Sequence, residues 1–242
     1  MKSKLYVVGI GPGGKEFMTE QAAQALNESE IIVGYTVYAD LVKKYYPDKE
    51  FITTPMKREK ERCEIALTKA QEGKTVAMVC SGDSGVYGMA GLILELGEKY
   101  KEVFVEIVPG ITAASSGAAV LGAPLIHDFA VISLSDLLTP WETIEKRLHS
   151  GAAADFVICL YNPSSHKRSD YLEKACDIIL EHRNSETICG YVKNIGREGQ
   201  TSEIMTLKEL RTRKVDMFTT VYIGNSQTRR IGNSMVTPRG YR

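Results

Sequence analysis

The chain has 242 residues, a length that fits one large domain or two small ones, each able to bury its own core. Hydrophobic residues make up 43% and charged residues 25%, which is typical of a globular protein. Lys and Arg together number 30, as do Asp and Glu, so the formal net charge is zero. This balance argues against a nucleic-acid binder whose affinity depends on a basic face, but it leaves room for local basic pockets that bind an anionic small molecule.

The cysteines give no sign of a disulfide framework or a zinc site. They are odd in number and no two stand in a C-x-x-C spacing: Cys63, Cys80, Cys159, Cys176 and Cys189. This usage fits a reducing cytoplasm, and no metal ligand is assigned. Residues 5–10 are apolar but short and run into a Gly-Pro loop, so they indicate a first strand and not a signal peptide. The longest apolar stretches are too short to span a bilayer, and we expect a cytoplasmic protein with no membrane partner.

Apolar runs alternate with amphipathic segments along the first half of the chain. We expect strands at residues 5–10, 31–35, 51–54, 75–80 and 103–108. We expect helices at residues 19–26, 58–72, 87–96 and 112–120. Thr19 is the expected N-cap of the first helix, and Gly73 is expected to end the second.

Residues 122–128 interrupt the alternation, and we place the domain boundary there, which gives domains 1–122 and 123–242. After it we expect strands at residues 129–134, 156–161, 187–192 and 219–224, and helices at residues 140–148 and 168–182. This pattern predicts an α/β fold of two α/β domains with mainly parallel sheets. In such sheets the ligand crevice lies beyond the carboxyl ends of the strands, where the glycine-rich loops of this sequence stand.

The first glycine-rich loop is Gly9-Ile10-Gly11-Pro12-Gly13-Gly14. Its glycine spacing matches two nucleotide-binding patterns, but the other residues that each pattern requires are absent. The G-x-G-x-x-G pattern of dinucleotide binders needs an acid at the end of the second strand, and no acid follows until Asp40. The G-x-x-x-x-G-K pattern needs Ser or Thr next, and Glu16 stands there instead. A tight turn that requires positive φ accounts for the glycines under any of these interpretations.

The second loop is Ser81-Gly82-Asp83-Ser84-Gly85-Val86-Tyr87, and the third is Val108-Pro109-Gly110-Ile111-Thr112-Ala113-Ala114. Glycines in the second loop allow a ligand to approach the backbone, and Asp83 offers a carboxylate to a cation or to ribose hydroxyls. The alternative is that Asp83 or Ser84 caps the following helix. The small residues of the third loop suit either a flat ligand or tight packing of a helix on a sheet.

In this order and at these spacings, the three loops resemble the tetrapyrrole methylase family, the class III S-adenosylmethionine methyltransferases. The matching pieces are Gly9–Gly13, Gly82-Asp83, Val86-Tyr87-Gly88 and Val108–Ala114. Within that family, residues 122–125, His127-Asp128-Phe129, residues 132–141 and Tyr161-Asn162-Pro163 are similar to the branch that methylates C17. One departure is Ser84, which stands where the family commonly has Pro.

The resemblance implies two α/β domains with the cofactor in the cleft between them, and a homodimer. It implies S-adenosyl-L-methionine as methyl donor and S-adenosyl-L-homocysteine as its product. The implied reaction is C17 methylation with ring contraction of a precorrin-3B or cobalt-factor III tetrapyrrole, with or without cobalt, in cobalamin biosynthesis. Carried over to this sequence, the cofactor contacts are Pro12, Ser81, Gly82, Asp83, Val86, Thr112, Ala113, Tyr161, Asn194, Ile195, Gly196 and Gly224.

Methyl transfer from a sulfonium needs alignment and no protein nucleophile, but ring contraction moves protons and gives a use to an acid–base group. His127 and Asp128 are the candidate catalytic residues, with Asp128 expected to orient the imidazole. A linker turn is the alternative interpretation of this pair. Lys193 is a weaker candidate. Arginines suit the carboxylates of the substrate, and the candidates are Arg58, Arg62, Arg168, Arg197, Arg229, Arg230 and Arg239.

Three alternatives stay open at the level of sequence. A sister methylase could act at another corrin position, on diphthine or on ribosomal RNA, although the neutral net charge weighs against RNA. An NAD-binding oxidoreductase would need the missing acid of the second strand. A non-enzymatic tetrapyrrole-binding module would have no use for the cofactor loops.

Overall fold

The computed structural model describes residues 3–165 and 167–241, and the chain divides into two compact units. The first unit ends at Ala113 and the second begins at Ala114. The sequence break at residues 122–128 had placed the boundary one helix later. That helix, α5 (Ala113–Leu121), groups with the second unit because its small-residue face packs there.

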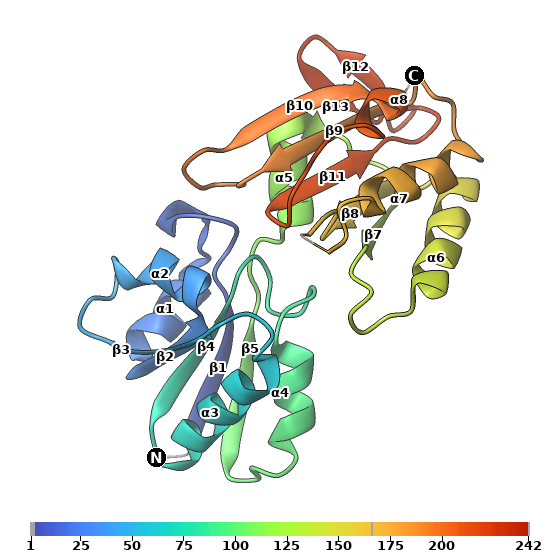
Figure 1. Cartoon of the computed structure of the whole chain (residues 1–242). Helices are drawn as coiled ribbons and strands as arrows, with labels where there is room; N and C mark the ends of the chain where they lie inside the picture. Colours follow the sequence, from blue (N-terminus) through green and yellow to red (C-terminus); the bar gives the residue numbers. More distant parts are fainter. Residues whose placement is uncertain (1–2, 166, 242) are drawn as a thin grey trace. The chain divides into compact units, whose positions relative to one another are not determined.

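In the first unit, strands and helices alternate as predicted (Figure 1). The strands are β1 (Ser3–Gly9), β2 (Ile31–Tyr35), β3 (Glu50–Thr54), β4 (Thr75–Cys80) and β5 (Val103–Val108). The helices are the 3-10 turn η1 (Lys15–Phe17), α1 (Glu20–Glu28), α2 (Thr36–Lys43), α3 (Glu59–Gln71) and α4 (Ala90–Gly97). The sheet order is β3-β2-β4-β1-β5 and every pairing in it is parallel, which confirms the expected architecture.

Both faces of this sheet are covered, which explains why its strands are almost continuously apolar. Alternate residues of β1 point to opposite faces, so Leu5 and Val7 belong to the core under α3 and α4. Tyr6 and Val8 belong to the core under α1 and α2. Consecutive apolar residues therefore each have a packing partner, and the carboxyl ends of β1, β4 and β5 meet at one edge of the sheet.

The second unit has a mixed sheet. Its elements are β6 (Gly122–Ala123), β7 (Phe129–Ser133), α6 (Trp141–Ala153), β8 (Val157–Tyr161), α7 (Tyr171–Leu180), β9 (Ile188–Lys193), β10 (Thr201–Thr206), α8 (Leu207–Leu210), β11 (Thr219–Ile223), β12 (Arg229–Ile231) and β13 (Ser234–Val236). The sheet order is β10-β9-β11-β8-β7, and only the β7–β8 pairing within it is parallel. The expectation of a mainly parallel sheet therefore holds for the first unit and needs correction for the second. A short turn joins β9 to β10, and such a turn can only connect antiparallel strands.

Different helices cover the two faces of the second sheet. Residues of α6, α7 and α8 form the core on one face, among them Ile144, Leu148 and Ile179. On the other face the buried Tyr222 of β11 donates a hydrogen bond from its hydroxyl to the carbonyl oxygen of Ala114 in α5 at 2.9 Å. A small sheet of β12, β13 and β6 completes the unit.

Several elements were not expected from the sequence, namely α2, β6, β10, α8, β12 and β13. Helix α4 also begins later than expected, at Ala90 and not near Tyr87, because Tyr87 has a φ of 54°, which a helix cannot contain. Among the described residues, every helix is too short or too polar to cross a bilayer.

Candidate cofactor-binding site

The first two glycine-rich loops are joined through their backbones at the carboxyl edge of the first sheet. The N–H of Gly11 donates to the carbonyl of Gly82 at 3.0 Å, and the N–H of Gly82 donates to the carbonyl of Gly11 at 2.8 Å. Both residues have positive φ, +73° and +70°, which glycine adopts without strain. The loop after β1 is thus held directly against the loop after β4.

Asp83 ties the second loop to the third. One oxygen of its carboxylate accepts hydrogen bonds from the N–H groups of Gly85 at 2.7 Å and Val86 at 3.0 Å. The other oxygen accepts from the N–H of Gly110 at 2.8 Å. The alternative interpretation, in which Asp83 caps the following helix, is wrong, because α4 begins only at Ala90. Its carboxylate positions the loops.

Close backbone approach explains the other glycines of the cluster. A Cβ on Gly9 would lie 2.6 Å from the amide nitrogen of Gly110, so neither position has room for a side chain. Ser84 is fully buried and donates from its hydroxyl to the carbonyl of Val108 at 2.9 Å. This hydrogen bond fixes the second loop to the end of β5.

The candidate contact residues of the first unit surround this cluster. Pro12 is buried beside Gly11, while Ser81, Thr112 and Ala113 are half-buried. A Cβ on Gly82 would lie 3.7 Å from its nearest neighbours, in Thr112 and Ala113, so the second loop is in ordinary van der Waals contact with the third. Three apolar side chains at the rim are exposed: Val86 at 37%, Tyr87 at 54% and Ile111 at 39%. Backbone polar groups beside exposed apolar side chains form a surface that suits a ligand with both kinds of group.

In the second unit, strand direction decides which candidate residues meet. Ser133 of β7 is in register with Tyr161 of β8, and β9 runs in the same direction, so Lys193 ends at the same edge. Tyr161, Asn194, Ile195 and Gly196 are therefore brought to one edge. The hydroxyl of Tyr161 accepts a hydrogen bond from the N–H of Ala114 at 2.6 Å. Ile195 is buried at 6% exposure, so only its backbone is available to a ligand.

Gly224 does not join this group. It follows β11, which is antiparallel to β8 and β9, so its end lies at the opposite edge, where Ile223 pairs with Ile158 and Cys189. The N–H of Gly224 donates to the carbonyl of Ile188 at 2.9 Å, and its own carbonyl accepts from Arg183 at 2.6 Å. Because β11 runs antiparallel to β8 and β9, the structure does not bring Gly224 to the edge that holds Tyr161 and Asn194.

His127 and Asp128 also lie at that opposite edge. The carbonyl of Asp128 accepts from the N–H of Val157 at 3.1 Å, at the start of both β7 and β8. The five residue steps from Asp128 to Ser133 at the end of β7 separate this point from the carboxyl edge by about 16 Å. The Nδ1 atom of His127 accepts from the backbone N–H of Asp128 at 2.9 Å, whereas the Asp128 carboxylate is 3.8 Å away. The backbone, and not the carboxylate, therefore orients this exposed ring. Within the second unit, the pair lies at the opposite edge from Tyr161 and Asn194.

The weaker catalytic candidate, Lys193, is at the carboxyl edge but is held in an ion pair. Its Nζ lies 2.7 Å from the carboxylate of Asp216, and this hydrogen bond raises the pKa of Lys193. Burial acts to raise the pKa of Asp216, but the hydrogen bonds from Lys193 and Thr219 outweigh it and the pKa is lowered. Lys193 thus stays protonated and is poorly suited to act as a base.

Asp136 lies in the loop that precedes α6, and its side chain bonds elsewhere than to that helix. Its carboxylate accepts from the hydroxyl of Tyr171 at 2.6 Å and from Arg168. The bond from Tyr171, followed by that from Arg168, lowers the pKa of Asp136. This charged pair fixes the loop after β7 against the start of α7.

Among the arginines considered for the substrate carboxylates, several have structural partners. Arg58 pairs with Glu61 on the surface of α3. Arg62, at 4% exposure, donates to the hydroxyl of Thr54 at 2.8 Å and to the carbonyl of Pro55 at 3.0 Å. Arg62 therefore fixes the end of β3 and is not a substrate ligand.

Sequence reasoning missed two residues that build the candidate site. Gly110 belonged to the matched motif but was not named as a site residue. It packs closely against Gly9, and its N–H donates to the carboxylate of Asp83. Asn162 has a φ of 52° and donates from Nδ2 to the Ser133 hydroxyl at 2.9 Å, which joins the loops after β7 and β8. The Asn-Pro pair after an apolar run was the available signal for this turn.

Comparison with known proteins agrees with this geometry. Residues 4–211 match the family model "Tetrapyrrole (Corrin/Porphyrin) Methylases". The chain is 49% identical to the "Probable cobalt-factor III C(17)-methyltransferase" of Salmonella typhimurium, over 98% of this chain and 99% of that protein. It is 38% identical to the "Precorrin-3B C(17)-methyltransferase" of a Sinorhizobium species, over 100% of this chain and 98% of that protein.

Some other curated relatives are longer, and the chain spans about half of their length. Among solved structures, the methyltransferase CobJ is similar with a TM-score of 0.89 and 36% identity, over 97% of this chain and 99% of that one. The resemblance carried by the three loops thus extends over the whole fold. The chain belongs to the tetrapyrrole (corrin/porphyrin) methylase family.

Proposed function

We propose that this protein transfers the methyl group of S-adenosyl-L-methionine to C17 of a precorrin-3B or cobalt-factor III tetrapyrrole, with contraction of the ring, in cobalamin biosynthesis. The observation that carries the proposal is the joining of the three family loops at one edge of the first sheet, through the Gly11–Gly82 pairing and the Asp83–Gly110 hydrogen bond. The named relatives are C17-methyltransferases, and the similarity runs along nearly the full length of both.

The residues present fit such a cofactor. The exposed side chains of Val86 and Ile111, beside the backbone polar groups of the loops, would accept the adenosyl and methionine parts of the donor. Pro12, Ser81, Thr112 and Ala113 are the proposed neighbouring contacts, and Asp83 is a positioning residue, because backbone N–H groups occupy both of its oxygens. We further propose that the edge with Tyr161, Asn194, Ile195 and Gly196 contributes to ligand binding.

The chemistry asked of these residues is modest. The sulfonium donor is already activated, so the protein has to align donor and acceptor for an in-line displacement, which can lower the barrier by about 7–11 kcal/mol. Fixed loops achieve that alignment without a nucleophilic side chain. His127 and Asp128 are not carried into the proposal because they lie at the opposite edge from the other second-unit residues.

A calorimetric titration tests the cofactor assignment. We expect wild-type protein to bind S-adenosyl-L-homocysteine and not NADH. The variant Gly82→Ala adds a methyl group at positive φ, in contact with Thr112 and Ala113. Gly73→Ala is the control for the backbone strain, since Gly73 also has positive φ, +91°, and has nothing within 4 Å of its Cβ position. Each substitution costs about 1–2 kcal/mol of backbone strain. If both variants are equally destabilised but bind S-adenosyl-L-homocysteine equally well, the loop is not the cofactor site.

The substrate is tested by incubation with each form of the intermediate. The higher identity to the cobalt-factor III relative favours the cobalt-bearing form. We expect the mass gain of one methyl group and the absorption spectrum of a contracted ring with cobalt-factor III, and slower turnover with metal-free precorrin-3B. Turnover of neither would refute the proposed reaction even if the cofactor binds. The homodimer implied by the family stays a prediction, which light scattering at micromolar concentration can check.

A further inference from the structure

Two imidazoles and a carboxylate converge at the surface of the second unit. His149 lies in α6, and Glu181 and His182 directly follow α7. The Nδ1 atom of His149 is 3.0 Å from the Nε2 atom of His182 and 3.8 Å from a carboxylate oxygen of Glu181. One ligand atom from each residue lies within 4.8 Å of the other two. These side chains are open to solvent, with exposures of 41% for His149 and 63% for Glu181.

These separations match those of ligands that share one metal ion. With metal–nitrogen bonds of about 2.0–2.1 Å, two imidazole nitrogens lie about 2.9 Å apart at a right angle and about 3.4 Å apart in a tetrahedron. The observed 3.0 Å falls within that interval. The carboxylate oxygen at 3.8 Å needs a shift of about half an ångström to bind the same ion, which an exposed Glu side chain can make through its rotamers.

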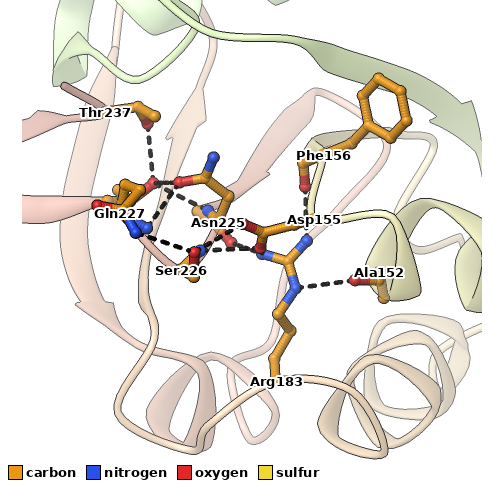
Figure 2. Close-up of polar contacts among 10 residues, drawn as sticks. Ala152, Asp155, Phe156, Arg183, Asn225, Ser226, Gln227 and Thr237 are labelled. Atoms are coloured by element: carbon orange, nitrogen blue, oxygen red, sulfur yellow. Dashed lines mark hydrogen bonds and ion pairs between the residues drawn. The ribbon is translucent and has the colours of Figure 1, made fainter. Parts of the chain in front are cut away.

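The backbone that carries His182 is fixed by its neighbour. Arg183 is only 8% exposed and extends into the polar cluster drawn in Figure 2. Its guanidinium donates to the carbonyls of Ala152 at 3.2 Å, Phe156 at 2.8 Å and Gly224 at 2.6 Å, and it pairs with Asp155 at 3.3 Å.

Ala152 lies in α6, three positions after His149, so Arg183 links the end of α7 to the end of the helix that carries the other imidazole. The ligand-bearing segments are held together before any ion binds, which lowers the entropic cost of binding one.

We propose that His149, Glu181 and His182 bind a divalent transition-metal ion of the Zn²⁺ class, with water completing the coordination. Two neutral imidazoles with one carboxylate suit Zn²⁺, Co²⁺ or Ni²⁺, whereas Mg²⁺ prefers oxygen ligands alone. The ion cross-links α6 to the end of α7 at the edge of the second sheet opposite Tyr161. It is therefore distinct from the cofactor edge and stabilises the fold without taking part in methyl transfer.

Calorimetry with Zn²⁺ and visible absorption with Co²⁺ test the site on the untagged full chain under reducing conditions. The cysteines are buried thiols, so they compete little for the ion. We expect one equivalent of Zn²⁺ to bind, a visible Co²⁺ spectrum with nitrogen ligation, no heat with Mg²⁺, and a rise in Tm with Zn²⁺. His149→Gln and His182→Gln are each expected to lose at least about tenfold in affinity, and Glu181→Gln to lose less.

His127→Gln is the matched control. His127 is also an exposed histidine beside a carboxylate, with Asp128 at 3.8 Å, but its Nδ1 atom accepts a backbone N–H and it has no imidazole partner among the described residues. It should leave Zn²⁺ affinity and the Co²⁺ spectrum unchanged. The proposal is overturned if wild-type protein binds neither ion at sub-millimolar concentration, if Mg²⁺ binds as tightly, or if the His149 and His182 variants keep wild-type affinity while circular dichroism shows both folded.

Discussion

Replacing Asp83 by Asn should loosen the candidate cofactor site with almost no change in shape. In the wild type, three backbone N–H groups donate to its two carboxylate oxygens. The amide of Asn keeps one oxygen, which can still accept from Gly85 and Val86. Its NH₂ group then faces the N–H of Gly110, so two donors meet and that hydrogen bond is lost.

The size of the effect follows from that single bond. A hydrogen bond to a charged group contributes about 1.5–3 kcal/mol, and Gly110 would lose its acceptor in a tightly packed loop. At 1.36 kcal/mol per tenfold, local opening should become about 10- to 150-fold more frequent. Affinity for S-adenosyl-L-homocysteine should fall in the same direction, because a smaller fraction of molecules holds the binding-competent loop.

Hydrogen–deuterium exchange at the Gly110 amide measures the opening, and calorimetry measures the affinity. Asp48→Asn, at an exposed carboxylate of the same unit, controls for the loss of one negative charge. If Asp83→Asn changes neither the exchange rate of Gly110 nor the affinity relative to Asp48→Asn, then Asp83 does not position the loops and the account of the site is wrong.

Three further predictions follow from other contacts. Gly117→Ala should strongly destabilise the second unit in urea unfolding, because its Cβ would overlap the hydroxyl of Tyr222, and adding Tyr222→Phe should restore part of the loss by removing that atom. The stability difference between wild type and Asp136→Asn should be constant from about pH 5 to 8 and shrink below about pH 4, since the bonds from Tyr171 and Arg168 lower the pKa of Asp136 and their contribution disappears when the folded-state carboxyl is protonated. His127→Ala should give wild-type yields of contracted product by mass and absorbance, and a selective loss of contraction would return this residue to the mechanism.

The first unit could be predicted from sequence almost completely because its rules are local. Continuous apolar strands, alternating with helices, require a parallel sheet that is covered on both faces. Each glycine-rich loop then falls at the same edge. What the sequence could not show is how the loops bind one another: Asp83 bonds to Gly110, 27 positions away, and nothing local distinguishes this from a helix cap. Helix α2 was not predicted either, because its N-cap residue, Tyr35, makes no side-chain capping hydrogen bond.

The second unit was predicted less well because hydrophobic periodicity does not indicate the direction in which a strand runs. Buried runs such as residues 219–223 have the same composition in a parallel or an antiparallel strand, so Gly224 was grouped with Tyr161 and Asn194. A single reversal, that of β11, moves Gly224 across the sheet. The Thr206–Glu209 capping box of α8 was a visible signal that could have shown the end of β10.

Family motifs and sites assembled by packing leave different traces in a sequence. A motif such as Gly9–Gly13 is contiguous because a loop bends within a few residues. The bend needs positive φ at Gly11, so the glycine itself marks it in the sequence. No local pattern marks the cluster of His149, Glu181 and His182. Its two imidazoles are 33 positions apart and meet only when α6 and α7 pack on one face of the sheet. The cysteine spacing excluded a zinc ribbon, but it had no bearing on ligands supplied by two helices. Direction and packing therefore decide the site chemistry of the second unit, and the glycine loops decide that of the first.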